Sequence, residues 1–230
     1  MKEIYNDLKN FIKKNFIGLI VIISLGIISA IITICWYNIP RLSYTYMKEY
    51  DGYVVDHAFG NSKKYTIPAS YKDSKVVGIG TRAFYKHDRL LEIEFENQDN
   101  IEIIMKLSFY QCSNLEYIDL LGVDTIERNA FSYCTSLNNI ELDAYQIGAS
   151  AFYKCEALDT ISLNEGIKSI GSMAFSNTKI SDIILPRSVT HVYSDAFIDM
   201  EELKSITIQN EMLMNNDYIK SLGSLIKYEG

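Results

Sequence analysis

Three cysteines are the residues of this 230-residue chain whose type and spacing most suggest chemistry. Cys112, Cys134 and Cys155 follow one another at intervals of 22 and 21 residues. Thiols can pair as disulfides in an oxidising compartment or bind zinc, but zinc sites use close pairs such as Cys-x-x-Cys. A disulfide between parallel neighbours would need a specific Cβ geometry. We therefore expect a column of small buried side chains, with disulfide bonding as the alternative.

The other strings that resemble enzyme motifs are poor candidates for catalysis. Residues 78–83 share part of their spacing with a dinucleotide fingerprint, but no strand–helix–strand pattern surrounds them. The three histidines, His57, His87 and His191, are far apart in the sequence. No set of residues supplies a nucleophile, a base and a group that orients the base. We therefore predict that the protein is not an enzyme and has no catalytic, cofactor-binding or metal site.

Most of these residues belong to a phrase that recurs along the chain, Ile-Gly-x-x-Ala-Phe-x-x-Cys-x-x-Leu-x-x-Ile-x-Leu. Its six phenylalanines are 21 to 25 residues apart: Phe84, Phe109, Phe131, Phe152, Phe175 and Phe197. An Ile or Val stands five residues before each Phe, and further Leu and Ile columns follow it at nearly constant offsets. A fixed period of about 20–29 residues with this apolar pattern predicts a leucine-rich-repeat solenoid.

The pattern also predicts how one repeat folds. A single repeat cannot bury its Phe, Ile and Leu side chains alone, whereas stacked repeats bury each column against its neighbours. The Leu-x-x-Ile-x-Leu part is typical of a short half-buried strand, paired in parallel with the next at a spacing of about 4.8 Å. The Ile-Gly-x-x-Ala-Phe part is expected to turn the chain across the opposite side. The expected fold is thus β-rich, with about six repeats and one short parallel strand per repeat.

From Thr66 to Ile208 this pattern resembles the BspA-type leucine-rich repeat, a family of mostly extracellular bacterial surface proteins. The resemblance rests on the phrase from Thr66 to Phe84 and on the copies that follow it. The departures are local: Ser108 replaces Ala, and the repeat after Phe175 is one residue short. The resemblance implies an exported solenoid that binds proteins or mediates adhesion. It does not imply a particular ligand.

Residues 16–37 form a second informative segment, because none of these 22 side chains is charged. A helix of that length would reach about 33 Å, enough to span a hydrocarbon core of about 30 Å. A cleaved signal peptide is the alternative, but Ile28 stands where its cleavage site needs a small residue. Four lysines precede the segment. The positive-inside rule then predicts a single-pass cell-membrane protein with a cytoplasmic N-terminus and an extracellular repeat domain.

The predicted organisation therefore has six parts. They are a cytoplasmic tail (1–15), a transmembrane signal anchor (16–37), a linker (38–50), an N-terminal cap (51–65), the leucine-rich repeats (66–208) and a C-terminal cap (209–230). The part after residue 37 is acidic, with 18 Lys and Arg against 27 Asp and Glu. Nucleic acid is excluded as an expected partner, because binding it requires a basic surface.

The outward-facing positions of the predicted strands form the candidate protein-binding face. Its residues are Glu92, Glu94, Glu116, Tyr117, Asp119, Asn139, Glu141, Asp159 and Thr160. Glu94, Asp119 and Glu141 are expected to stack as a carboxylate ladder about 5 Å apart, which is mildly destabilising. The ladder is either a solvated face that keeps the solenoid soluble or a docking surface for a cationic partner. In the second case Tyr117 would be the aromatic anchor, with calcium bridging as a variant.

Two classes of function remain open. The favoured one is a membrane-anchored surface protein that presents the solenoid to a protein partner or to another extracellular or host ligand. The alternative is a structural or accessory subunit that binds a partner within its own cell envelope. In that case Gly18 with Gly26 or Ser29 would allow close packing of the membrane helix. Neither class calls for a cofactor.

Overall fold

The computed structural model describes Ile27, Ser29 and residues 41–229. The chain divides into two compact units, residues 1–39 and residues 40–230. In the first unit only Ile27 and Ser29 are described, both as helical. The predicted cytoplasmic tail (1–15) and nearly all of the predicted anchor (16–37) lie outside the described residues. Within the described part of the chain, no helix has the length and apolar character needed to cross a membrane.

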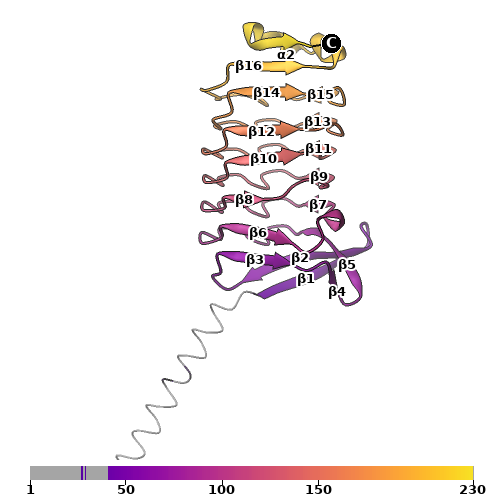
Figure 1. The fold of residues 1–230 in the computed structure, drawn as a ribbon, viewed down its shortest axis with the longest axis vertical. Coiled ribbons are helices and arrows are strands. Elements are labelled where there is room, and N and C mark those ends of the chain that lie inside the picture. Colours follow the sequence, from indigo (N-terminus) through magenta and orange to yellow (C-terminus); the bar gives the residue numbers. More distant parts are fainter. Residues whose placement is uncertain (1–26, 28, 30–40, 230) are drawn as a thin grey trace, which may run out of the picture. The chain divides into compact units, whose positions relative to one another are not determined.

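The second unit is a solenoid whose repeat strands stack level upon level along one axis (Figure 1). These strands form three short sheets, ordered β3-β6-β8, β10-β12 and β14-β16-β17, and every pair in them is parallel. Their bounds are β3 (Lys64–Ile67), β6 (Glu92–Phe95), β8 (Tyr117–Ile118), β10 (Asn139–Leu142), β12 (Thr160–Leu163), β14 (Asp182–Leu185), β16 (Ser205–Ile208) and β17 (Ile226–Tyr228). The six predicted strands are β6, β8, β10, β12, β14 and β16. β3 adds one level before them, and β17 adds one level after them.

The register of these strands follows the isoleucine column of the sequence. Ile93 pairs with Ile118, Ile140 with Ile161, and Ile183 with Ile206. The last pair includes the repeat that is one residue short, so the deletion is absorbed in the turn before β14 and the strand keeps its place. The prediction of short parallel strands is confirmed.

The prediction of one strand per repeat is wrong, because each repeat contributes two. The Ile-Gly part of the phrase also forms strands, which join in a nine-stranded sheet, called here the long sheet. Its repeat members are β5 (Ser74–Ile79), β7 (Ile103–Ile104), β9 (Thr125–Ile126), β11 (Gln146–Ile147), β13 (Ser169–Ile170) and β15 (His191–Val192). The strands form because the backbones approach closely there: Gly148 N donates to Ile126 O at 2.7 Å.

A third set of backbone hydrogen bonds connects the turns that carry the repeat phenylalanines, and we call this side of the solenoid the turn face. Asn129, Phe131 and Tyr133 donate their N–H groups to the carbonyls of Ala149, Ala151 and Tyr153 in the next repeat, at 3.0, 2.8 and 2.8 Å. The residues two before and two after each Phe have positive φ, for example 59° at Asn129 and 64° at Tyr133. These left-handed residues aim alternate N–H groups along the solenoid axis toward the following repeat.

The interior of the solenoid is built around the repeat phenylalanines, called here the Phe column. The first five are at most 1% exposed and Phe197 is 4% exposed. Neighbouring rings are stacked with centroids 5.1 to 6.3 Å apart and interplanar angles of 13° or less. Tyr65 meets Phe84 edge-on at one end, and Tyr218 stacks on Phe197 at the other. Rings in van der Waals contact with their neighbours make this column the main source of cohesion between repeats.

The N-terminal end of the solenoid is covered by an antiparallel hairpin, β1 (Arg41–Met47) and β2 (Gly52–Phe59), which extends the long sheet. The two-residue strand β4 (Ser70–Tyr71) pairs with β5. β1 lies inside the range predicted as a linker (38–50), so residues 41–47 of that range form a strand. The alternation of Leu42, Tyr44 and Tyr46 in RLSYTYM is the strand signal that indicates it.

Short helical turns occupy the C-terminal end and one inter-strand connection. The C-terminal group comprises η2 (Glu211–Asn215), α2 (Asp217–Ser221) and η3 (Gly223–Leu225), followed by β17. Asn216 caps α2 by accepting from Ile219 N at 3.0 Å, and Tyr218 OH accepts from Phe197 N at 2.9 Å. The remaining 3-10 turn, η1 (Gln98–Asn100), follows β6. Leu213 and Ile219 are buried against the last repeat, so this group closes the apolar end of the solenoid.

His87 predicts a pH dependence of stability at the N-terminal end. Its Nε2 lies 3.0 Å from Tyr65 OH, and burial lowers the pKa of its imidazole below the usual value. The folded protein therefore favours neutral His87, whereas the unfolded chain takes up a proton near pH 6.5. The stabilisation is complete above that pH and is lost as the pH falls through it toward the lower folded-state pKa.

We expect the urea midpoint to fall between about pH 7.5 and about pH 5.5, and His87→Met to reduce that fall. Methionine is a suitable replacement because Met200 occupies the same column in the last repeat. An unchanged pH dependence in His87→Met would contradict the assignment.

Candidate protein-binding face

Five of the nine predicted face residues meet around one hollow on the repeat strands. Tyr117, Asp119, Asn139, Glu141 and Thr160 line a surface hollow of about 360 Å³ over β8, β10 and β12. Side chains alternate along a strand, so the residues between these polar positions point inward. Ile118 and Ile140 are accordingly buried, 2% and 6% exposed. The hollow thus combines an apolar floor with a polar rim.

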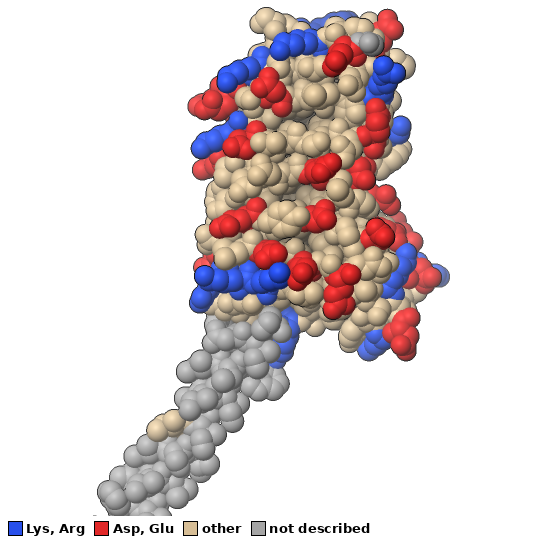
Figure 2. All heavy atoms as spheres, viewed as in Figure 1, with Lys and Arg blue, Asp and Glu red and all other residues tan. Residues whose placement is uncertain are grey.

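Tyr117 is the most prominent apolar side chain at this hollow. It is 55% exposed, and its alignment beside Glu92 is fixed by the pairing of β6 with β8. Tyrosine provides a large contact area with a polar tip, which is why it is enriched where proteins bind one another. In Figure 2, acidic side chains are spread singly over the middle of the visible face of the solenoid, and basic side chains lie toward its margins.

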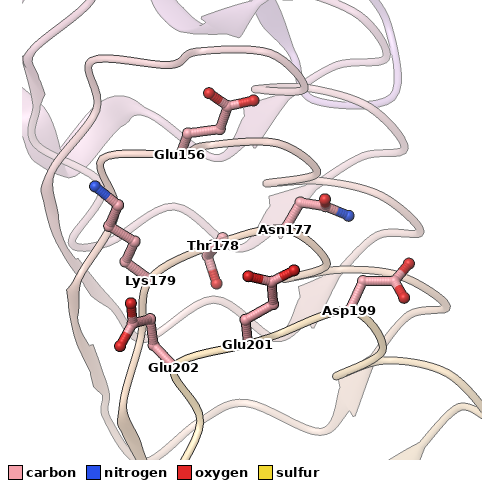
Figure 3. Close-up of a pocket in the computed structure, with 7 residues that line it drawn as sticks. All are labelled: Glu156, Asn177, Thr178, Lys179, Asp199, Glu201 and Glu202. Carbon is pink, nitrogen blue, oxygen red and sulfur yellow. The ribbon is translucent and has the colours of Figure 1, made fainter.

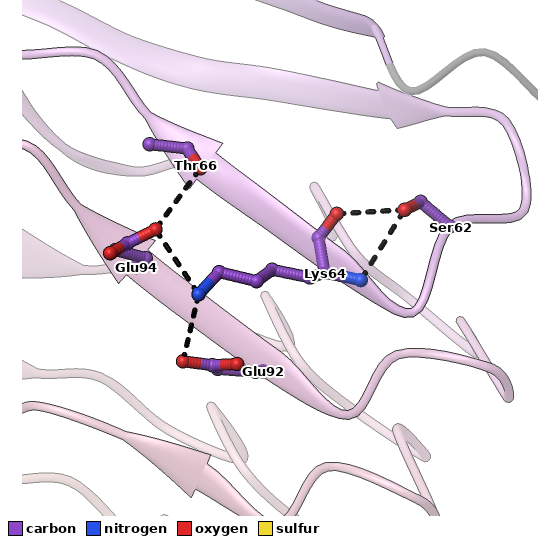
Figure 4. Close-up of polar contacts among 5 residues, drawn as sticks. All are labelled: Ser62, Lys64, Thr66, Glu92 and Glu94. Atoms are coloured by element: carbon purple, nitrogen blue, oxygen red, sulfur yellow. Dashed lines mark hydrogen bonds and ion pairs between the residues drawn. The ribbon is translucent and has the colours of Figure 1, made fainter.

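The two glutamates at the N-terminal end of the face are already paired. Lys64 of β3 places its Nζ 3.1 Å from Glu92 Oε1 and 3.2 Å from Glu94 Oε2 (Figure 4). Thr66 also donates its hydroxyl to Glu94 Oε2, at 3.3 Å. Hydrogen bonds to the two carboxylates raise the pKa of Lys64. Lys64 was predicted to lie in the N-terminal cap (51–65), so the sequence analysis did not include this cation in the face. The signal that could have identified it is the alignment of Lys64 with Glu92, 28 residues later.

The predicted carboxylate ladder is therefore divided among different partners. Glu94 pairs with Lys64, Asp119 accepts from Leu121 N at 3.1 Å, and Glu141 accepts from Asn164 Nδ2 at 2.9 Å. These contacts offset part of the repulsion expected between stacked carboxylates. Asp119 and Glu141 remain as the acidic groups of the hollow.

Glu116 and Asp159 lie beside the face rather than in the hollow. Both are exposed and precede β8 and β12. The Asp159 carboxylate accepts from the hydroxyl of Thr160 at 2.9 Å. The structure thus groups Tyr117, Asp119, Asn139, Glu141 and Thr160, and leaves the other four predicted residues outside that group.

The cysteine column is buried and contains no disulfide. Cys112, Cys134 and Cys155 are free thiols with no exposed surface. Each donates to the backbone carbonyl of the Phe in the preceding repeat, at 2.9, 3.1 and 3.2 Å. Burial raises the pKa of Cys112 to about 12 and also raises the pKa of the other two thiols. Because the thiolate is the reactive form, these residues act as packing groups.

We expect the three repeat cysteines to resist alkylation in the folded protein. Iodoacetamide at about pH 8 should leave them unmodified in buffer and modify all three in urea, since unfolding restores an ordinary thiol pKa near 8.5. Mass spectrometry of the peptides that contain them distinguishes them from Cys35, which lies outside the described residues. Rapid modification of Cys134 in buffer would show that the column opens in the native state.

A second hollow, of about 280 Å³, lies among the turns of the last repeats (Figure 3). Its lining residues are Glu156, Asn177, Thr178, Lys179, Asp199, Glu201 and Glu202. Sequence reasoning did not single it out, because apart from Thr178, which takes the place of a cysteine in the cysteine column, these residues follow the Phe column at offsets that carry no shared residue type. Across the part of the chain that the structure describes, no three His, Cys, Asp or Glu residues are grouped so as to hold a metal ion.

Comparison with known proteins places this geometry in a family. Residues 29–144 and 124–225 match the BspA type leucine rich repeat region, in six copies. The crystal structure of a leucine rich cell surface protein from Faecalibacterium prausnitzii A2-165 is 21% identical, with a TM-score of 0.60, and the match covers 75% of this chain and 55% of that one. The leucine rich repeat protein of T. pallidum is 26% identical, with a TM-score of 0.50, and covers 72% of this chain and 68% of that one. No curated protein matches the chain.

The chain thus spans about half the length of the F. prausnitzii protein. That likeness supports the fold, and the family assignment rests on the repeat match, which extends over most of the chain. The matched residues contain all six rings of the Phe column, the cysteine column and every repeat strand except β17. This chain belongs to the BspA-type leucine-rich repeat family.

Proposed function

We propose that the protein is a cell-surface binding protein, anchored in the membrane by residues 16–37, whose repeat domain faces outward. In this proposal the repeat domain captures a protein partner through the hollow between β8 and β12 and performs no catalysis. The observation that carries the proposal is the pairing of a highly exposed Tyr117 with an apolar-floored hollow. A leucine-rich repeat solenoid suggests protein binding or adhesion, and the F. prausnitzii structure is of a cell surface protein.

The chemistry of the hollow favours a partner with a basic patch. Asp119 and Glu141 are its only titratable lining residues besides Tyr117, and the chain after residue 37 carries nine more acidic than basic residues. Such a field attracts a cationic surface and repels an anionic one. Tyr117 would then bury its ring against the partner while the two carboxylates fix the orientation.

A photo-crosslinking experiment tests the proposal. The full chain carries p-benzoylphenylalanine in place of Tyr117 and is irradiated with a mixture of extracellular proteins separated into basic and acidic fractions. We expect adducts with the basic fraction, and we expect them to decrease as salt rises because the attraction is electrostatic. Neutralising the hollow with Asp119→Asn and Glu141→Gln should abolish most of them.

Tyr145 supplies the matched control, because it is 59% exposed and lies away from the hollow. The same photo-crosslinker at Tyr145 should give few adducts. Equal labelling from both positions, or adducts at position 117 that survive the neutralising changes, would refute binding through this hollow.

A further inference from the structure

The turn face has a charge pattern that reverses from one end of the solenoid to the other. Its two left-handed columns lie two residues before and two residues after each Phe. The column before runs Arg82, Leu107, Asn129, Ser150, Met173, Asp195, and the column after runs Lys86, Gln111, Tyr133, Lys154, Asn177, Asp199. The first repeat is therefore basic in both columns, and the last repeat is acidic in both.

The charges at the two ends are available to a partner. Arg82, Lys86 and Asp199 are exposed, and no ion pair between residues 41 and 229 includes them or Asp195. The guanidinium of Arg82 and the ammonium of Lys86 lie 5.6 and 5.4 Å from the centre of the Tyr85 ring, which holds them at the surface. Asp195 accepts from the Ser172 hydroxyl at 2.8 Å, which leaves its negative charge in place.

Tyrosines occupy the middle of the same face. The Tyr133 ring contacts the rings of Tyr110 and Tyr153, with centroids 5.4 and 5.5 Å apart. Lys154 lies over both Tyr133 and Tyr153, at 5.4 and 5.7 Å from their centres. A central aromatic area with charged groups at its margins is the usual composition of a specific protein–protein interface.

We propose that this face binds a second copy of the chain, with the two solenoids antiparallel and related by a two-fold axis. This two-fold axis lies in the plane of the interface and is perpendicular to the solenoid axis. It places each left-handed column opposite the same column of the second copy, with the repeats in reverse order. Arg82 then faces Asp195 of the second copy, and Lys86 faces Asp199 of the second copy. Each contact occurs twice, as a self-complementary two-fold interface requires. The spacing between the charged residues is the same on the two turn faces, since both copies are made of the same repeats.

The pattern also selects the orientation. In a parallel arrangement the two columns exchange places, so Arg82 would face Lys86, and Asp195 would face Asp199. Like charges in direct contact repel one another, which disfavours that arrangement. The acidic hollow of Figure 3 reinforces the antiparallel one, because Glu201 and Glu202 lie beside Asp199 where the basic first repeat of the second copy would arrive.

An alternative explanation of the charge reversal is that it stabilises a single copy of the chain, and this explanation makes a different prediction. The turn-face N–H groups that connect neighbouring repeats point toward the following repeat, which leaves a partial positive charge at the last repeat and a partial negative charge at the first. Acidic residues at the former and basic residues at the latter would be stabilising, as at helix ends. On that account, reversing a charge lowers thermal stability and has no effect on association.

Co-purification of two differently tagged full-length copies separates these accounts. Wild-type copies should co-purify. Lys86→Asp and Asp199→Lys should each reduce co-purification with themselves by roughly tenfold or more, because both symmetric contacts become repulsive. Both residues suit the left-handed backbone, since Asp tolerates it and Lys occupies it at position 154.

The decisive sample mixes the two single variants. A Lys86→Asp copy facing an Asp199→Lys copy has opposite charges at both contacts again, so co-purification should return. Lys204→Asp is the control, because Lys204 is exposed in the turn before β16, outside the turn-face columns. The proposal is overturned if wild-type copies do not co-purify, if either single variant associates normally, or if the mixed pair is not rescued while both variants remain folded by circular dichroism.

Discussion

Replacing Phe131 with alanine is expected to lower the free energy of unfolding by about 3–5 kcal/mol. The Phe131 ring is fully buried and lies between Phe109 and Phe152, with centroids 5.1 and 5.3 Å away. Truncation leaves a cavity bounded by two parallel rings. This cavity cannot close, because the backbone hydrogen bonds between repeats hold the repeats at a fixed spacing. In a solenoid each repeat depends on its neighbours, so this cavity separates the repeats on either side of it.

Urea denaturation followed by circular dichroism measures this loss. Tyr145→Ala is the control, since an exposed tyrosine of the same domain should change stability by no more than about 0.5 kcal/mol. Equal effects of the two substitutions would show that the Phe column does not carry the cohesion assigned to it. A changed m-value in Phe131→Ala would indicate that the solenoid unfolds in parts.

Gly148→Ala is expected to cost about 1–3 kcal/mol, the range found for overpacked sites. A Cβ at this position would lie 2.7 Å from both Arg128 N and Glu127 C and 2.8 Å from Ile126 O. These are backbone atoms of the previous repeat, so no side-chain movement relieves the contact. The substitution therefore forces β9 and β11 apart and weakens the long sheet at its centre.

Tyr193→Ala provides the comparison, because Tyr193 stands at the same offset from Phe197 and is 59% exposed. We expect it to change the urea midpoint little. If Gly148→Ala were equally mild, the close approach of these two repeats would not be a requirement of the fold.

The apolar columns were the part of this fold that the sequence could predict. The Phe column and the isoleucine register depend on side chains that recur at nearly constant offsets, and the register survives even in the short repeat, where Ile183 comes one residue early and still pairs with Ile206. Periodicity of this kind reports burial directly. The second strand of each repeat was missed because two residues, such as Gln146 and Ile147, are too few to show an alternating pattern.

The left-handed turn residues were missed for a different reason. Such positions usually carry glycine or asparagine, whereas here they include Arg82, Leu107 and Met173, all with φ between 54° and 62°. The conformation is imposed by hydrogen bonds to the next repeat, which no local propensity reveals. The charge reversal along these columns consequently cannot be recognised from the sequence without the structure of the turn face.

The polar rim of the candidate site could be predicted from the sequence, but the ion pairs that its acidic residues form within the chain could not. Strand alternation was sufficient to place Tyr117, Asn139 and Thr160 on one face. The pairing of Lys64 with Glu92 and Glu94 depends on β3 forming a level of its own, which the apolar columns do not indicate. This pairing moves the unpaired acidic character of the face toward Asp119 and Glu141.

Protease treatment of intact cells that express the full chain, with a different tag at each end, tests the central claim most directly. The account predicts that the C-terminal tag is lost and that a short N-terminal fragment is protected until the cells are lysed. That result would agree with an outward-facing repeat domain anchored by residues 16–37. Protection of both tags in intact cells, with cleavage only after lysis, would place the repeats inside and contradict a role in surface binding.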